Sequence, residues 1–304
     1  MDKIQEKLRL LAQISGKSQE TLAKELKVSF PAFNAWINGR SIPREAAMIR
    51  ITKLLQDYGV ATCSVESISV KKSAVFDLVE KVKHPLKKII NRTDLIDELS
   101  LRITYNSNAI EGSTLSIEDT ASVIFDGRNL SNKTINEHLE AKNHDRAFRF
   151  LLDYLAQKKS IDEMLCKKLH AILLAGIRDD AGNYRFHSVR IAGSYVPTAN
   201  YLKVPELMKN LFKRKPGKDI LAHIASFHAD FEKIHPFADG NGRVGRLLVI
   251  GLLLDNGFAP AIIAKKKRPA YYKALQKAQL DDDYAPIEDF IIDAVIDGYR
   301  ILLD

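Results

Sequence analysis

The amino-acid sequence predicts an all-α protein that contains one small β-hairpin. Apolar residues recur at helical steps through most of the chain from Val75 onward, most clearly over 138–155. A single stretch, 189–197, alternates polar and apolar residues as a short hairpin does. Near the N-terminus, two short apolar stripes that each follow a serine predict a separate small helical unit.

The order of these elements divides the chain into three parts. Residues 1–58 are predicted to form the small helical unit, 59–74 a linker, and 75–304 the larger helical region. The middle segment lacks helical periodicity and contains short β-branched pieces, so we expect a linker or short strands there. With 46% hydrophobic residues over 304 positions, the chain can bury a large core.

The N-terminal unit has the pattern of a helix-turn-helix. Ser18 and Ser29 each precede an apolar stripe, and a serine at that place caps the start of a helix. Two short helices joined by a tight turn, with Val28 buried in the turn, make such a motif. Residues 1–58 hold ten Lys or Arg and six Asp or Glu, so they carry +4 of the chain's net charge of +8. This excess favours an anionic partner.

Residues 8–55 resemble the small helical domain of phage-repressor-type regulators. The resemblance implies that the second helix enters the major groove of duplex DNA. The groove-facing residues would be Ser29, Phe30, Pro31 and Asn34, and Arg40 and Arg44 would contact phosphates. Because Phe30 and Pro31 lack the groups that read base edges, a dimerisation or docking module remains the alternative.

Twelve consecutive residues, HPFADGNGRVGR, combine the groups of a phosphate-handling active site. His235 can accept a proton near neutral pH, and Asp239 offers a hard oxygen ligand that suits a magnesium ion on phosphates. Glycines on both sides of Asn241 let backbone N–H groups converge on an anion at the start of an apolar helix. Arg243 and Arg246 share one face of that helix and offer forked donors to phosphate.

The same run resembles, without a mismatch, the signature HxFx(D/E)GNGRxxR of the Fic family (filamentation induced by cyclic AMP). Members of this family mostly transfer AMP from ATP to protein hydroxyls. The resemblance implies that His235 is the general base and that Asp239 is a ligand of Mg²⁺. The residues that it assigns to the phosphates are Gly240, Asn241, Gly242, Arg243 and Arg246.

A second segment, SNAIEG at 107–112, resembles the inhibitory motif (S/T)xxxE(G/N) of one subclass of the family. The resemblance implies an inhibitory helix around 95–112, with Ser107 at the start of the motif. Its Glu111 would pair with Arg246 and block the productive position of the γ-phosphate. Considered alone, a Glu before a Gly also fits a helix end with a solvated carboxylate.

Two further segments resemble parts of the family's nucleotide site, within a catalytic core of about 162–297. The hairpin around 189–201 resembles the flap, which clamps the backbone of the protein target as an added strand. Its residues Ala192, Gly193, Ser194 and Tyr195 would border the nucleotide. Tyr271, Tyr272 and Gln279 match a segment that lines the nucleoside pocket, although the two tyrosines also fit ordinary core packing.

The resemblance as a whole implies an autoinhibited protein adenylyltransferase. ATP would be the co-substrate and Mg²⁺ the cofactor, and the acceptor would be a Ser, Thr or Tyr hydroxyl of a protein, this chain included. Two alternatives stay open: a DNA-binding regulator whose Fic region senses nucleotide, and an enzyme that mainly removes AMP, with Glu111 positioning water.

Cysteine usage and hydropathy give the remaining expectations. Cys63 and Cys166 are too few and too far apart for a disulfide framework or a metal cluster, which suits a reducing compartment. No apolar run approaches the roughly 20 residues that a membrane-spanning helix needs, and the charged first residues do not read as a secretory signal. We therefore expect a cytoplasmic protein without membrane contact, and we leave its oligomeric state open.

Overall fold

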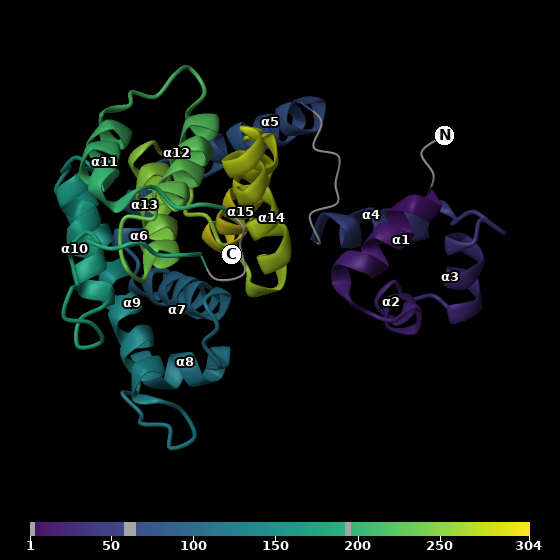
Figure 1. Ribbon diagram of the computed structural model, residues 1–304, viewed down its shortest axis with the longest axis horizontal. Helices are drawn as coiled ribbons and strands as arrows, with labels where there is room; N and C mark the ends of the chain where they lie inside the picture. The colour runs from purple at the N-terminus through teal and green to yellow at the C-terminus, as the bar shows by residue number, and fades with distance from the viewer. Residues whose placement is uncertain (1–3, 58–64, 192–195) are drawn as a thin grey trace. The chain divides into compact units, whose positions relative to one another are not determined.

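The computed structural model describes residues 4–57, 65–191 and 196–304 (Figure 1). All regular elements in these ranges are helices, which confirms the predicted all-α class. The chain forms two compact units, which are Met1–Cys63 with Lys266–Ala274, and Ser64–Lys265 with Leu275–Asp304. In the described ranges, no helix combines the length and the apolar character that crossing a bilayer would require.

The N-terminal helices lie where the sequence predicts them. They are α1 (Ile4–Ser15), α2 (Gln19–Glu25), α3 (Phe30–Ile37) and α4 (Glu45–Asp57). The hydroxyl of Ser18 accepts a hydrogen bond from the Thr21 N–H at 3.2 Å, and that of Ser29 accepts one from the Ala32 N–H at 3.4 Å. These four helices share one hydrophobic core of their own. Their use as a DNA-binding helix-turn-helix remains a prediction.

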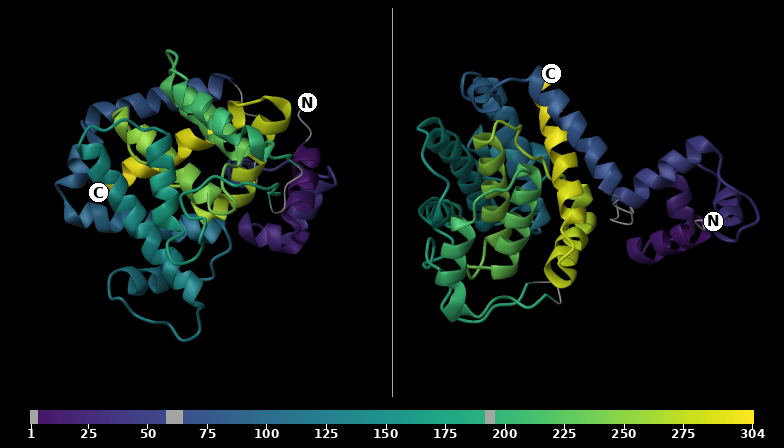
Figure 2. Two further views of the ribbon diagram at one scale, coloured as in Figure 1. Left: turned by 60° about the vertical axis from the view of Figure 1, so that its left-hand side comes forward. Right: turned by 90° about the horizontal axis from the view of Figure 1, so that it is seen from above.

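The larger unit contains most of the remaining helices (Figures 1 and 2). In chain order they are α5 (Val65–Lys81), α6 (Pro85–Ile90), α7 (Thr93–Ile110), α8 (Ile117–Ile124), α9 (Ile135–Ala156), α10 (Glu163–Leu173), the 3-10 turn η1 (Tyr201–Lys203), α11 (Val204–Lys213), α12 (Ile220–Ile234), α13 (Asn241–Asp255) and α15 (Ala285–Leu303). The turn η2 (Lys265–Lys267) and α14 (Arg268–Asp281) precede α15 and include the residues that cluster with the N-terminal unit.

Helix α13 forms the centre of the larger unit. It packs against α12, α10, α9 and α7, and its side chains are buried almost all round. A helix that is apolar on every face has to be surrounded by other elements, because any exposed face would leave apolar surface in water. This central position fixes the first turns of α13, which contain the second half of the run 235–246.

The segment predicted as a linker or short strands is helical in its second half. Helix α5 begins at Val65 and packs along α15. Its Lys71 forms ion pairs with Asp289 at 2.8 Å and Asp293 at 2.9 Å, and Lys72 contacts Asp219 and Glu288. These pairs join α5 to acidic residues more than 140 positions later in the chain. The local pattern of 65–74 could not reveal them, which is why the helix was not predicted.

The predicted hairpin is not confirmed. Residues 182–191 and 196–200, on either side of its tip, contain no strand in the described part of the chain. One side-chain bond joins the two arms, from the Thr198 hydroxyl to the Val189 carbonyl at 2.8 Å. Ala192, Gly193, Ser194 and Tyr195 lie outside the described residues.

Candidate active site

The short connection between α12 and α13 carries the predicted base. His235 follows the last residue of α12 and takes a left-handed backbone conformation with φ of 52°. Its Nδ1 donates to the Glu232 carbonyl one turn earlier, at 3.2 Å. Because a carbonyl can only accept, this bond places the proton on Nδ1 and leaves Nε2 as the acceptor of the neutral ring.

Burial favours the neutral form of this imidazole. It lowers the pKa of His235 below its ordinary value of 6.5, and the positive charge of Arg185 lowers it further, while the bond to Glu232 acts in the opposite sense. At neutral pH the ring is therefore an unprotonated base.

The backbone after His235 is held by side chains rather than by regular structure. The Asn241 amide donates to the Phe237 carbonyl and accepts from the Phe237 N–H, both at 2.8 Å. His170 donates from Nε2 to the Asp239 carbonyl at 3.1 Å and accepts from the Gly182 N–H at 2.7 Å. Its ring stacks on Phe237, with 3.8 Å between ring centroids, and burial lowers its pKa to about 4. These bonds preorganise the loop.

The Asn241 contacts refine one expectation. The residue was assigned to the α-phosphate, but its amide oxygen and amide nitrogen are both committed to Phe237. In this arrangement the Asn241 side chain shapes the loop, and its assignment to the phosphate stays a prediction.

Asp239 is the exposed member of the loop. Its side chain is 53% exposed, and its Oδ1 accepts from the Gly240 N–H at 2.6 Å. Among the described residues, no three His, Cys, Asp or Glu side chains gather as a metal-binding group. The exposed Asp239 carboxylate would fit a magnesium ion that takes its other ligands from phosphates and water.

Glu111 lies against the start of α13. A Cβ atom built on Gly242 would be 2.2 Å from the Glu111 Oε1 and 2.9 Å from the Arg246 Nη1. Only a glycine allows the carboxylate to approach this closely. The negative charge of Glu111 thus lies at the positive end of the helix, where an anionic ligand would also be stabilised.

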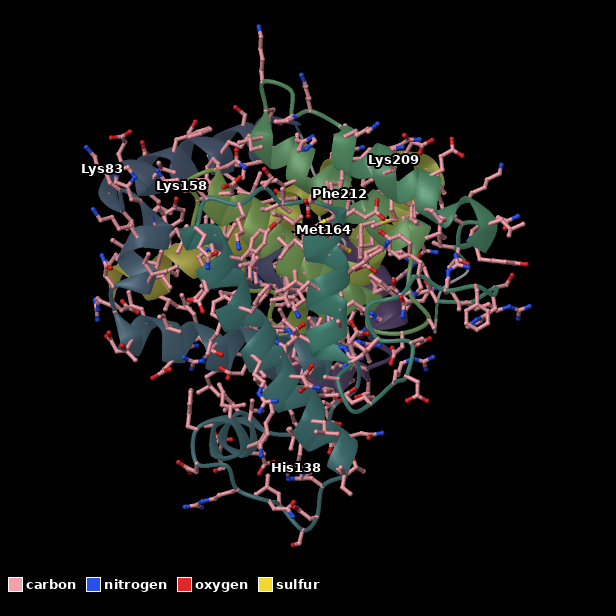
Figure 3. The ribbon with its side chains drawn as sticks, turned by 90° about the vertical axis from the view of Figure 1, so that its left-hand side faces the viewer. Lys83, His138, Lys158, Met164, Lys209 and Phe212 are labelled. Carbon is pink, nitrogen blue, oxygen red and sulfur yellow. The ribbon has the colours of Figure 1, made fainter. Side chains whose placement is uncertain are left out.

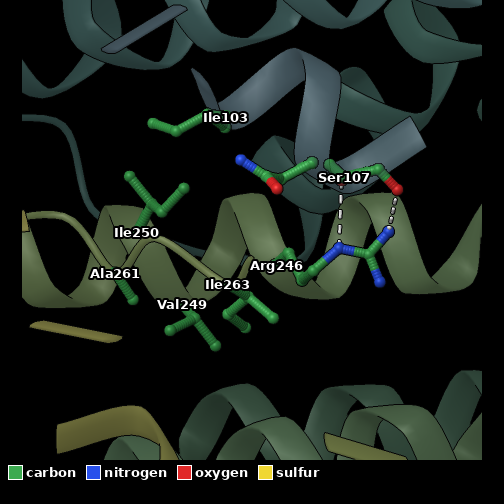
Figure 4. A pocket seen from close by; sticks show the side chains of 8 residues that line it. Ile103, Ser107, Arg246, Val249, Ile250, Ala261 and Ile263 are labelled. Atoms are coloured by element: carbon green, nitrogen blue, oxygen red, sulfur yellow. Dashed lines mark hydrogen bonds between the residues drawn. The ribbon is translucent and has the colours of Figure 1, made fainter. Parts of the chain in front are cut away.

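Arg246 is held from two directions by α7, which ends at Ile110. Its Nη2 donates to the Glu111 Oε1 at 2.7 Å and to the Ser107 carbonyl at 2.9 Å, and its Nε donates to the Ser107 hydroxyl at 3.0 Å. Figure 4 shows the Ser107 and Arg246 side chains at one end of a small pocket that is otherwise lined by Asn106 and by apolar residues of α7, α13 and 261–263. The pairing predicted between Glu111 and Arg246 is present.

Arg243, the other signature arginine, is also paired with an acid. Its Nη1 donates to the Glu140 Oε1 at 2.7 Å, and its Nη2 lies 3.5 Å from the Asp239 Oδ2. The guanidinium is only 4% exposed, so this pairing occurs away from bulk water. Both arginines assigned to phosphates therefore face carboxylates.

A buried polar layer lies around Arg246. Burial raises the pKa of Glu232 to about 8, and burial together with Arg246 lowers the pKa values of His228 and His144 to about 3. Glu232 is therefore largely protonated and the two histidines are neutral at pH 7.

The segment after Glu111 is anchored by α9. Glu137 accepts from the Thr114 N–H at 2.8 Å and the Thr114 hydroxyl at 2.7 Å, and it also caps α9 at Thr134. These bonds, the one from Thr114 first, lower the pKa of Glu137 to about 2. Lys133 donates to the Thr114 carbonyl at 2.8 Å. The connection between α8 and α9 is held by His138, which is labelled in Figure 3. Its Nε2 accepts from the Leu130 N–H at 2.9 Å.

The predicted nucleoside residues all lie on α14. Tyr271 is buried, Tyr272 is half-buried, and their ring centroids are 5.4 Å apart. Both lie on the part of α14 that clusters with the N-terminal unit. Gln279 is buried in the larger unit and donates to the Ala229 carbonyl at 3.3 Å. Their assignment to the nucleoside stays a prediction.

Four polar residues of the site were given no role of their own from the sequence, namely His170, Arg185, Glu140 and Glu232. A signal was present for two of them. His170 and Glu232 each interrupt the apolar stripe of a helix, and a polar residue on a buried face needs a specific partner. Arg185 and Glu140 gave no such signal, because their partners are distant in sequence.

Comparison with known proteins identifies a family for part of the chain. Residues 160–253, from the start of α10 through most of α13, match the Fic/DOC family. Protein adenylyltransferase Fic of Drosophila melanogaster is 32% identical over 196 residues, which are 62% of this chain and 39% of the fly protein. The chain thus spans about two fifths of the length of the curated relatives that it matches.

Solved structures support the fold over a longer stretch. A Fic family protein from Desulfovibrio desulfuricans G20 is 26% identical and superposes with a TM-score of 0.64 over 81% of this chain and 76% of its own. Fic-1 from C. elegans superposes with a TM-score of 0.68 over 93% of this chain and 84% of its own, at 23% identity. The second likeness concerns the fold alone.

Proposed function

Because this chain contains a Fic domain and is related to protein adenylyltransferase Fic, we propose that it transfers AMP from ATP to a hydroxyl group of a protein. The observation that carries this proposal is a neutral histidine with a free Nε2, fixed next to a helix N-terminus that bears two arginines. That combination provides a base and an anion site within one loop.

In the proposed reaction, the oxygen of a target Ser, Thr or Tyr attacks the α-phosphorus of ATP. His235 accepts the hydroxyl proton at Nε2 as the new phosphorus–oxygen bond forms. The bond from the α-phosphorus to the oxygen that bridges it to the β-phosphate breaks, and pyrophosphate leaves. The N–H groups at the start of α13 stabilise the charge on the transferred phosphate, and Arg243 and Arg246 hold the leaving group. A magnesium ion on Asp239 would neutralise phosphate charge.

The same site would be held in a suppressed state by Glu111. Its carboxylate engages Arg246 and lies against Gly242, so that a γ-phosphate cannot take the same guanidinium. Incubating the purified protein with labelled ATP and a cell lysate, followed by mass spectrometry of labelled bands, tests the transfer. We expect weak labelling from the unaltered protein and strong labelling once Glu111 is removed.

The Glu137 anchor gives a prediction about this suppression. Glu137→Gln should raise labelling about three- to tenfold. The Glu137 carboxylate accepts from both Thr114 and Thr134, whereas an amide can accept through one oxygen only. The loss of one such hydrogen bond costs roughly 1 kcal/mol, which corresponds to a change of that size. The substitution changes none of Arg246, Glu111 and His235. An increase in labelling would therefore come from a displaced C-terminal end of α7.

The matched control is Glu118→Gln, which removes an exposed carboxylate on the first turn of α8. Initial rates of labelling at fixed ATP should distinguish the two variants. Equal rates in Glu137→Gln, in the control and in the parent protein would show that the anchor does not support the inhibitory contact.

We further propose that the N-terminal unit binds duplex DNA. Arg40, Arg44 and the start of α3 are exposed, with Phe30 46% exposed, and the unit has a net positive charge. In gel shifts with the full chain, affinity should fall as salt rises. Arg40→Ala and Arg44→Ala should weaken binding to every sequence by a similar factor, because phosphate contacts carry no sequence information.

Lys24→Ala is a suitable control, since this exposed lysine lies on α2 and pairs with Glu20. The absence of any complex at low salt would favour a docking or dimerisation module instead.

A further inference from the structure

Arg185 lies on the first of the two arms, 182–191 and 196–200, that flank the tip of the predicted flap, and its side chain is almost fully buried at 3% exposure. We propose that Arg185 is a positioning residue for the transfer reaction, which holds His235 and the flap arms at a fixed separation. This inference rests on the proposed AMP transfer.

The side chain binds the end of α12. Its Nε donates to the His235 carbonyl at 2.7 Å, and its Nη2 lies 3.3 Å from the Ile234 carbonyl. The backbone N–H of Arg185 also donates to the Pro236 carbonyl at 2.9 Å. Three successive carbonyls around the base therefore bind one residue. They include groups that a helix C-terminus leaves without an internal partner.

The same guanidinium binds one carbonyl of its own arm and one of the second arm. Its Nη1 donates to the His187 carbonyl at 2.8 Å on the first arm, and its Nη2 donates to the Ala199 carbonyl at 2.5 Å on the second. The Ala199 N–H in turn donates to the Lys233 carbonyl of α12 at 3.4 Å. A segment bound along these arms would thus be held at a distance from His235 that Arg185 sets.

Each hydrogen bond that the structure gives this side chain goes to a backbone carbonyl. The positive charge therefore lies at the negative end of α12, where it is favourable without a carboxylate partner. A lysine could keep the charge, but a single ammonium cannot reproduce the planar fork that reaches four carbonyls. Charge and geometry can consequently be separated by two substitutions.

Both substitutions should be tested in protein that also carries Glu111→Gly, so that transfer is measurable. Arg185→Lys should lower kcat about ten- to a hundredfold, because a displacement of about 1 Å at a reacting group has an effect of that order. The KM for ATP should change little, since the phosphates are held by other residues. Arg190→Lys, on the same arm and exposed, is the matched control.

The pH dependence separates positioning from simple loss of structure. Three charged groups influence His235, namely Arg185, Glu111 and Asp239. Arg185→Met removes a positive charge that lowers the pKa of His235, so the acid limb of the transfer rate should move to higher pH. Arg185→Lys keeps the charge and should leave that limb in place while kcat falls.

A titration of His235 by NMR, with its signal assigned from the loss in His235→Asn, gives a readout that does not need activity. The expected result is a higher His235 pKa in Arg185→Met and an unchanged one in Arg185→Lys. Full kcat in Arg185→Lys, or an unchanged His235 pKa in Arg185→Met, would overturn the proposal. If the methionine variant fails to fold, the kcat of the lysine variant decides. If the Glu111→Gly parent transfers no AMP, the proposed function fails, and the titration still decides the role of Arg185.

Discussion

Replacing His235 by alanine should abolish AMP transfer while ATP binding and thermal stability stay nearly unchanged. We expect the rate to fall by about two to four orders of magnitude, which is the usual contribution of a general base. The experiment is most sensitive in protein that also carries Glu111→Gly, because the parent rate is then high enough for such a loss to be measured.

AMP transfer can be lost without loss of ATP binding because the proposed base and the proposed phosphate contacts are different residues. His235 presents Nε2 to the site because its Nδ1 is bound to the Glu232 carbonyl, and burial keeps the ring neutral. The groups that we propose to bind the phosphates are elsewhere, on Arg243, Arg246 and the start of α13. Transfer should accordingly be lost on acidification as pH falls through the lowered His235 pKa, since only the neutral ring accepts a proton.

Incorporation of labelled AMP, binding of a fluorescent ATP analogue and thermal unfolding can be measured on one preparation. His223→Ala is the control, because His223 is half-buried on the same helix but outside the loop. His235→Asn is a second variant, since asparagine tolerates the left-handed backbone of this position. Undiminished labelling in both His235 variants would show that another group is the base.

Replacing Glu111 by glycine should raise self-labelling and target labelling by about tenfold or more. The pair with Arg246 is partly buried, with side-chain exposures of 5% for the arginine and 33% for the glutamate. Charge-assisted hydrogen bonds of this kind contribute about 1.5–3 kcal/mol, and roughly 1.4 kcal/mol corresponds to a tenfold change in population. Removing the carboxylate frees the guanidinium for a γ-phosphate.

Glycine is a cleaner substitution than glutamine because it removes the whole acceptor. Glu111 is also the C-cap residue of α7, with φ of −83° and Gly112 following it, so a glycine there should alter the helix end little. Glu98→Gln, a half-buried position on the same helix that pairs with Arg102, is the control for general effects on α7.

The same variant distinguishes addition of AMP from its removal. If Glu111 positions a hydrolytic water, Glu111→Gly should lose the ability to strip AMP from a substrate modified beforehand, and modified protein should accumulate. Time courses with pre-modified substrate and without ATP measure this directly. A variant that neither gains transfer nor loses removal would show that Glu111 has no regulatory role, and His235 could still be the base.

The local sequence was sufficient for features that depend on neighbouring residues. The run 235–246 contains its base, its turn and its arginines within twelve positions, so their proximity follows from the chain itself. The caps at Ser18 and Ser29 are similarly local, and the helices begin where these serines predict. The pairing of Glu111 with Arg246 was predicted because two short motifs resembled one family, although 135 positions separate the two residues.

The tertiary structure alone decided the contacts for which no local pattern exists. Hydrophobic periodicity predicts which face of a helix is buried, but it does not specify which helix covers that face. Glu140 therefore could not be matched to Arg243 across 103 positions, nor Arg185 to the carbonyl of His235 across 50. Helix α5 was missed for the same reason. Its Lys71 pairs with Asp289 of α15 and its Lys72 with Asp219, the N-cap residue of α12, and both partners are distant in sequence. The identities of the reactive groups are local properties of the chain, whereas their orientation depends on buried hydrogen bonds that form only when distant segments pack together.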